Sequence, residues 1–342
     1  KSLFSLTKPR VVVLLQITAM CAILCHDLIE SNEINQDTLE IMLIVFVGGY
    51  LTAGGANAIN MWYDRDIDPK MSRTSGRAIP SGKVEADSAL IFGILISIIG
   101  VLWFYEMANE VAAFWSAFSV LFYVFIYSIW LKRTTSQNIV IGGIAGSTPP
   151  VIGWSASVES LSISTDSVAS LLESVVELGS PMPWFMFVLI FLWTPPHFWA
   201  LALYRSEEYA EVGVPMLPNV KGPERTLLEM KFYSILLILL SISAPTTLEA
   251  IQIEDWSYHV LSWTILGLSL WYASTVWRID ISEEPDETGR ISSAANSFFV
   301  SMLYLALMFV VLVTGSFGQP GVVFGAIIAT VFIARTELKS TT

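Results

Sequence analysis

Three side chains that could bind a divalent cation recur at intervals of four residues near the end of a long apolar segment. They are Asn60, Asp64 and Asp68, with Arg65 and Asp66 between them. A spacing of four places side chains on one stripe of a helix, and charged groups at the mouth of a membrane bundle are costly and typical of function. Oxygen ligands suit Mg²⁺, which is usually held by one or two carboxylates and by substrate phosphates. The stripe therefore predicts a metal site.

Basic side chains follow this stripe directly. Arg73 and Arg77 are the strongest candidates for phosphate binding, because a planar guanidinium group matches two phosphate oxygens at once. Pro69 disfavours helical geometry at the residue before it, so we expect Asp68 to end the helix and begin a loop. Acidic groups for a metal followed by basic groups for phosphate predict a diphosphate site. The alternative is a solvated helix end whose aspartates are satisfied by Arg65.

The composition is that of an integral membrane protein. Hydrophobic residues make up 54% of the 342 residues and charged residues only 14%, whereas a soluble domain carries about 25% charged residues. The mean hydropathy of +0.62 agrees. Cys21 and Cys25 lie one helical turn apart in the first apolar segment, so we expect them to fill packing space and to form no disulfide framework.

Ten apolar segments are long enough to cross a bilayer, which takes roughly 20 residues per helix. The predicted fold is all-α: a polytopic transmembrane bundle of nine helices around a central cavity, with a tenth, C-terminal span that Gly321 and Gly325 interrupt. We expect residues 1–342 to form a single membrane domain, with an insertion at 157–183 and an additional hydrophobic segment at 320–334. The segments lie near residues 11–27, 40–62, 87–105, 111–130, 138–156, 184–203, 227–247, 257–276, 295–315 and 320–334.

The basic residues fix the predicted orientation. If each segment crosses once, all 18 lysines and arginines fall on one side, and the positive-inside rule makes that side cytoplasmic. We therefore expect a cell-membrane protein whose N-terminus and two long loops, 64–86 and 204–226, are cytoplasmic. The loop at 157–183 would then lie outside the cytoplasm.

That outer loop contains a short amphipathic pattern. Its apolar residues recur at helical spacing, Asp166 could serve as the N-cap, and Gly179 could follow the C-terminus. We expect a surface helix there, with a lid or a partner-docking segment as the alternative. The apolar residues are Val168, Leu171, Leu172, Val175 and Val176.

The pattern Asn60-x3-Asp64-Arg65-x2-Asp68, followed by Arg73-x3-Arg77-x2-Pro80, resembles the first aspartate-rich motif of the UbiA-type intramembrane prenyltransferases. Within that superfamily the chain resembles the haem O synthases, or protohaem IX farnesyltransferases, from about Leu6 to the ninth helix. The segments at 157–183 and 320–334 depart from the resemblance. The other matching stretches are Tyr127–Thr134, Asn138–Trp154, Trp193–Tyr209 and Gly213–Pro218.

This resemblance implies a reaction and its participants. A farnesyl group would pass from farnesyl diphosphate to a vinyl group of haem b, with addition of water, to give haem O for terminal oxidases. Two Mg²⁺ ions would be held by Asn60, Asp64, Asp68 and Glu208. Quinone-type relatives carry a second Asp-x3-Asp cluster, whereas the matching positions here are Tyr204 and Glu208. The predicted diphosphate-binding residues are Arg65, Arg73, Arg77, Lys132 and Arg205.

His197 is the predicted haem contact. It follows Pro195 and Pro196 near the cytoplasmic end of the sixth segment, where we expect the two prolines to break the helix. A histidine can ligate haem iron or donate to a propionate. A lone histidine on an apolar helix is otherwise a hydrogen-bonded core residue, and that alternative stays open.

Other functions are compatible with parts of the sequence. The same chemistry could serve a quinone precursor, a chlorophyllide or an archaeal lipid ether, although the incomplete second cluster and the Pro-Pro-His-Phe-Trp segment argue against these acceptors. A transporter or a catalytically idle oxidase assembly factor are alternatives from other classes. We expect contact with membrane lipid, an association with a haem A synthase or a haem-copper oxidase, and no nucleic-acid partner.

Overall fold

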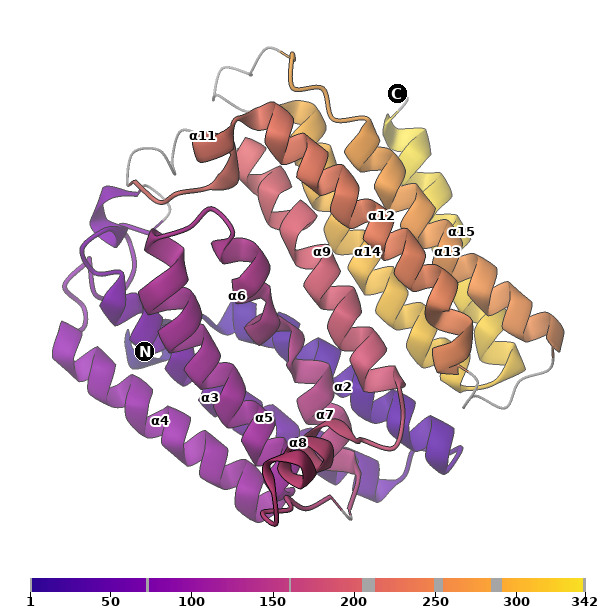
Figure 1. Ribbon diagram of the computed structural model, residues 1–342, viewed down its shortest axis with the longest axis horizontal. Helices are drawn as coiled ribbons and strands as arrows, with labels where there is room; N and C mark the ends of the chain where they lie inside the picture. Colours follow the sequence, from indigo (N-terminus) through magenta and orange to yellow (C-terminus); the bar gives the residue numbers. More distant parts are fainter. Residues whose placement is uncertain are drawn as a thin grey trace.

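The computed structural model describes residues 2–71, 74–159, 161–204, 213–248, 255–283 and 291–340. Every regular element within these ranges is helical (Figure 1). The elements are α1 Ser2–Leu6, α2 Pro9–Glu30, α3 Gln36–Tyr63, η1 Asp68–Lys70, α4 Ala86–Met107, α5 Glu110–Leu121, η2 Phe122–Trp130, η3 Leu131–Arg133, α6 Asn138–Ser147, α7 Pro149–Ser157, α8 Val168–Val176, α9 Met182–Tyr204, α11 Leu217–Lys221, α12 Pro223–Leu248, α13 Asp255–Trp277, α14 Ser292–Ser316 and α15 Gln319–Ser340.

Ten stretches of helix in the described residues are long and apolar enough to cross a membrane. They coincide with the ten segments expected from hydropathy, so the prediction of an all-helical integral membrane protein is confirmed. The tenth, in α15, is helical through Gly321 and Gly325. Glycine is tolerated there because both positions pack against α14: a Cβ on Gly325 would lie 2.4 Å from Oγ1 of Thr314.

The bundle has two groups of helices with α9 between them (Figure 1). One group contains α2 to α7, and the other contains α12 to α15. Helix α9 packs against α12 and α14 on one side and against α6 on the other. Helix α2 also bridges the groups, since it packs against both α7 and α14. Residues of both bridging helices, α2 and α9, contribute to the buried apolar core.

Helices α3 and α4 pack closely against each other through small residues. A Cβ on Gly55 would lie 2.6 Å from the carbonyl oxygen of Gly93, and one on Gly93 would lie 3.0 Å from that of Gly55. Small residues let helix backbones approach closely in membranes, where packing drives association. The contact fixes the C-terminal part of α3, which carries Asn60.

Proline affects two helices in different ways. At Pro149 and Pro150 the fifth span breaks at Thr148, which separates α6 from α7. The predicted break at Pro195 and Pro196 is wrong, because α9 runs through both prolines to Tyr204. Proline removes a backbone donor, but α9 is held on both sides of the bundle, and packing by neighbouring helices lets membrane helices retain proline.

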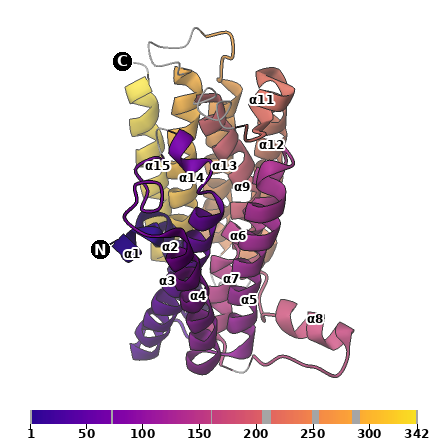
Figure 2. The same ribbon diagram turned by 90° about the vertical axis from the view of Figure 1, so that its left-hand side faces the viewer.

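The outer amphipathic helix exists as α8 and projects from the side of the bundle, at the end opposite α11 (Figure 2). Its N-cap is Ser167 and not Asp166, because the Ser167 side chain accepts from the backbone of Ser170 in a capping box. The helix ends at Val176, so Gly179 lies beyond the position expected for it. Gly179 does adopt a positive φ of 77°, which favours glycine.

Both cysteines are free, and Cys25 is buried, in agreement with their predicted role as packing residues. The single-domain prediction for residues 1–342 stays a prediction.

Candidate active site

The acidic stripe lies where α3 ends. The helix finishes at Tyr63, so Asp64 is its C-cap and Asp68 belongs to η1. The expectation that the helix would extend to Asp68 is therefore corrected: of the three residues, only Asn60 lies within the α-helix. The backbone N–H of Asp68 still donates to the carbonyl oxygen of Asp64 at 2.9 Å, so the turn keeps these residues together. Asp64 and Asp68 are 0% and 2% exposed, which rules out a solvated helix end.

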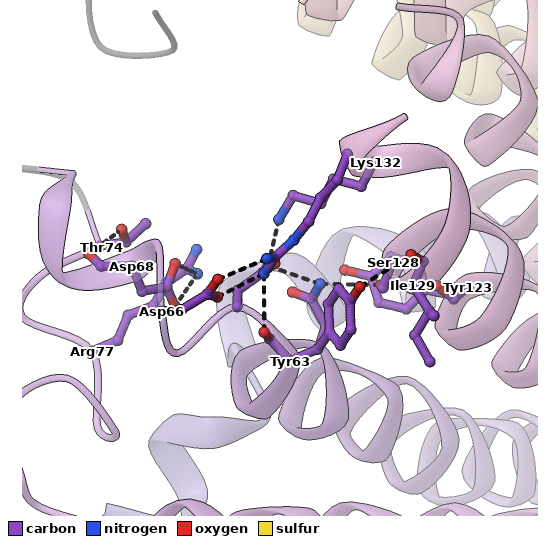
Figure 3. A network of polar contacts seen from close by, with 12 residues as sticks. Tyr63, Asp66, Asp68, Thr74, Arg77, Tyr123, Ser128, Ile129 and Lys132 are labelled. Carbon is purple, nitrogen blue, oxygen red and sulfur yellow. Dashed lines mark hydrogen bonds and ion pairs between the residues drawn. The ribbon is translucent and has the colours of Figure 1, made fainter. Parts of the chain in front are cut away.

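Asp68 is bound by the loop that follows it. The Nη1 group of Arg77 donates to both carboxylate oxygens at 2.8 Å (Figure 3). The hydroxyl of Thr74 donates to the backbone carbonyl of Asp68 at 2.8 Å. Arg77, a predicted phosphate ligand, therefore lies at the acidic cluster, and its partner in the structure is the carboxylate of Asp68.

Two further cations come from the end of the fourth span. Lys132 donates to Asp64 in an ion pair. Arg133 forms a two-pronged hydrogen bond with Asp66, with both N···O distances 2.7 Å, and lies 3.6 Å from Asp64. The hydrogen bonds from Arg133 lower the pKa of Asp66. The fourth span therefore contributes two cations to the mouth of the site.

Lys8 is a fourth cation at the cluster. Its Nζ donates to Oδ1 of Asn60 at 2.9 Å. Burial, together with the nearby charges of Arg77 and Lys132, lowers the pKa of Lys8 to about 7. From the sequence, Lys8 is only one of the basic residues that orient the chain, because nothing in its local pattern connects it with a residue 52 positions away.

Asn60 is oriented by its other contacts. Its Nδ2 donates to Asp64 and to the hydroxyl of Ser128, both at 3.1 Å. Ser128 lies in η2, a stretch of π-helix, where its hydroxyl donates to the carbonyl of Tyr123 at 2.9 Å. Such π-helical turns are frequent at functional sites. No residue pattern pointed to Ser128, since a π-helix has no simple sequence signature.

The donor set fits a hard divalent cation. Oδ1 of Asp64 is fully buried and has no hydrogen-bond partner, although a buried polar atom normally has one. Within the described ranges, no cluster of three histidine, cysteine or acidic residues is present; two carboxylates and one amide are brought together. The further predicted ligand, Glu208, lies outside the described residues, as do Arg73 and Arg205.

The described contacts of Arg65 lie outside the acidic cluster. It is exposed, it donates to the carbonyl of Trp62 at 2.9 Å, and its guanidinium group covers the Trp62 ring at 4.6 Å.

His197 lies on α9 and faces α14. It is 8% exposed, and its Nδ1 lies 2.6 Å from the hydroxyl of Ser301. The rings of Trp193 and Phe298 stack on the imidazole with centroid distances of 4.2 and 4.7 Å. The histidine is thus held in a defined orientation within the helix bundle.

Comparison with known families agrees with this arrangement. The model of the UbiA prenyltransferase family matches residues 19–294. The chain belongs to the UbiA prenyltransferase family. Two relatives of this UbiA prenyltransferase are the protohaem IX farnesyltransferases of Bartonella tribocorum and Parvibaculum lavamentivorans. The first is 40% identical over 308 residues, covering 89% of this chain and 87% of the relative; the second is 38% identical over 331 residues, covering 95% and 92%. The resemblance drawn from the motifs is confirmed.

Solved structures share the UbiA fold. One, described in work on digeranylgeranylglyceryl phosphate synthase in membranes, superposes with a TM-score of 0.68 at 17% identity and covers 93% of this chain and 98% of its own. A UbiA homolog from Archaeoglobus fulgidus, bound to DMAPP and Mg²⁺, superposes with a TM-score of 0.58 at 16% identity and covers 91% and 99%. These similarities support the fold.

Proposed function

We propose that this chain transfers the farnesyl group of farnesyl diphosphate to a vinyl group of haem b and, with the addition of water, produces haem O. The buried pairing of Asp64 and Asp68 with Lys132 and Arg77 carries the diphosphate part of the proposal. The relatives named protohaem IX farnesyltransferase, which match about nine tenths of the chain, support haem as the acceptor.

The cluster is suited to exchanging one set of partners for another. In the structure the carboxylates of Asp64 and Asp68 are neutralised by the cations of the chain itself. When a metal–diphosphate complex enters, Lys132 and Arg77 would release the carboxylates and donate to phosphate oxygens, while Lys8 adds a third positive group. The buried charges would then remain paired in both states, as the low dielectric requires.

The metal would be held by Asn60, Asp64 and Asp68, with Glu208 for a second ion. Bound Mg²⁺ supplies Lewis-acid neutralisation of the diphosphate. Oδ1 of Asp64, which lacks a hydrogen-bond partner, favours this use of the site. Arg65, Arg73 and Arg205 remain predicted diphosphate ligands, and the count of two ions is part of the proposal.

The bond changes follow from the substrates. The C1–O bond of farnesyl diphosphate breaks, and its electron pair leaves with diphosphate. Arg77, Lys132 and Lys8 stabilise that leaving group, because fixed donors act strongly where charge develops. The π electrons of the haem vinyl group form the new C–C bond. Water then captures the resulting cation and loses one proton, which leaves a hydroxyethylfarnesyl group.

The distribution of basic residues supports an orientation in which the N-terminus and the diphosphate site face the cytoplasm. His197 is the proposed contact to haem. The association with a haem A synthase or a haem-copper oxidase also remains a prediction, and a lid or docking role for α8 remains the alternative to a plain surface helix.

The proposal is tested with the purified chain in vesicles that contain haem b, farnesyl diphosphate and Mg²⁺. Reversed-phase chromatography of the extracted haem should show a more hydrophobic product that depends on farnesyl diphosphate. The Asp64→Asn variant is the matched control, and it should give no product. An unchanged haem with the folded wild-type chain, or prenylation of an added aromatic acid in place of haem, would contradict the proposed acceptor.

A further inference from the structure

The hydrogen bonds around Ser301 determine which nitrogen of His197 carries the proton. The Ser301 hydroxyl donates its one proton to the carbonyl of Phe298 at 2.6 Å, because a carbonyl oxygen can only accept. The contact of 2.6 Å between Ser301 Oγ and His197 Nδ1 must therefore use a proton on the nitrogen. His197 is thus the Nδ1–H tautomer, and the lone pair lies on Nε2.

The rings on either side fix the plane of the imidazole. Trp193 and Phe298 lie nearly parallel to it, with interplanar angles of 21° and 23°. Two rings cannot occupy one face at these distances, so they hold the imidazole from both sides. Trp193 is itself anchored, since its Nε1 donates to the carbonyl of Ser301 at 2.8 Å. Rotation of the His197 ring is therefore opposed by three contacts.

Nε2 remains available to a ligand. Within the described residues it has no hydrogen-bond partner. The fully enclosed polar atoms that lack a partner there belong to Trp62, Asp64, Arg133, Trp199 and Tyr272. Nε2 is not one of them, so part of the 8% exposure of His197 falls on this atom. A metal-ligating histidine has this arrangement. One ring nitrogen is held by a hydrogen bond, and that hydrogen bond leaves the lone pair of the other nitrogen to bind the metal.

We infer that Ser301 is a positioning residue: by accepting the Nδ1 proton of His197, it directs the Nε2 lone pair to the iron of haem b. This inference rests on the proposed function, since it requires haem as the acceptor. Accepting the Nδ1 proton also raises the basicity of the imidazole, and loss of such an outer partner typically costs about 10-fold to 100-fold in metal affinity.

The experiment uses the full chain in detergent micelles with ferrous haem b added. Resonance Raman spectroscopy measures the iron–histidine stretching band, and absorption titration measures haem affinity. The wild-type chain should show the band, and His197→Ala should lose it. Ser301→Ala should retain a band of lower frequency and bind haem about 10-fold more weakly. Ser301→Thr keeps a hydroxyl, which can bond the preceding turn in the same way, and should restore both values.

Ser297→Ala is the matched control, because Ser297 is also fully buried on α14, one turn earlier, and its side chain bonds Thr275 at 3.4 Å. It should behave like the wild-type chain. If Ser301→Ala and Ser297→Ala give the same band and affinity, the positioning role is overturned. Haem farnesylation without any histidine band would reject the ligation and leave the proposed function standing. A histidine band in a chain that never alters haem would reject the proposed function and keep the site.

Discussion

The ammonium group of Lys132 donates to the carboxylate of Asp64, although the two residues are 68 positions apart. This contact joins the end of the second span to the end of the fourth. Asp64→Asn keeps the size of the side chain and removes the charge that a metal requires. We expect turnover to fall by at least about 100-fold, as for the loss of a group that stabilises a leaving anion. Product chromatography measures it, and the helical content should be unchanged. Substantial turnover by Asp64→Asn would exclude Asp64 as a metal ligand.

Arg77→Lys tests whether the shape of the side chain or its charge is used. Nη1 of Arg77 spans both oxygens of Asp68 at 2.8 Å, and lysine cannot reproduce the planar donor array of arginine. We expect kcat/KM for farnesyl diphosphate to fall about 10-fold or more, equivalent to at least about 1.4 kcal/mol. Haem affinity should not change. A variant with wild-type kinetics would show that Arg77 acts only as a distant positive charge.

The fold could be predicted from sequence because its main physical determinant is local. A run of apolar residues long enough for a bilayer must form a helix there, since every backbone group needs a partner within the segment. The ten spans follow from this constraint. The exact end of α3 was harder to predict. Pro69 indicates that a helix boundary is near, but it does not show that the helix ends at Tyr63.

The candidate site was predictable only in part. Asn60, Asp64, Asp68 and Arg77 stand close together in the sequence, and their spacing carries the signal. Ser128 comes from another helix, and Lys8 is the N-cap of α2; both meet Asn60 only through tertiary packing. The two prolines of α9 show the same limit: their local preference predicts a break, and contacts with neighbouring helices prevent it.

Lys8→Met tests the contribution of this distant cation. Methionine keeps an apolar stem of similar length and removes the donor to Asn60. A hydrogen bond that involves a charged group contributes about 1.5–3 kcal/mol, so we expect kcat/KM for farnesyl diphosphate to fall about 10-fold to 100-fold. Steady-state kinetics at saturating haem measure the change. Lys83→Met is the control, because Lys83 is exposed and has no described side-chain partner. Equal kinetics for both variants would remove Lys8 from the site.

Removal of divalent metal should stop turnover without unfolding the protein. Asp64 and Asp68 pair with Lys132 and Arg77 of the chain itself, so compensation of their buried charges does not depend on a metal. A chelator should therefore abolish product formation, Mg²⁺ should restore it, and the unfolding temperature should change by less than about 2 °C, or about 1 kcal/mol or less for a chain of this size. Cooperative unfolding on chelation would show that the metal is structural, contrary to this expectation.

Glu337 links the last helix, α15, to the bundle, well away from the acidic cluster. Its carboxylate accepts from Nε1 of Trp271 at 2.8 Å and from two nitrogens of Arg278 at 2.8 and 3.0 Å. Arg278 and Glu337 are 48% and 36% exposed, so solvent weakens their pairing and exposed pairs contribute only about 0.2–1 kcal/mol.

Glu337→Gln should therefore lower the unfolding temperature by about 1–3 °C, because the amide oxygen can still accept from Trp271 but the charge that pairs with Arg278 is lost. Turnover should not change, because α15 packs mainly against α13 and α14. Arg335→Gln is the matched control, since it also changes one charge near the end of α15 and Arg335 has no described partner. Thermal unfolding in detergent, followed by tryptophan fluorescence, separates the two variants. A loss of turnover in Glu337→Gln alone would show that the docking of α15 is coupled to the site.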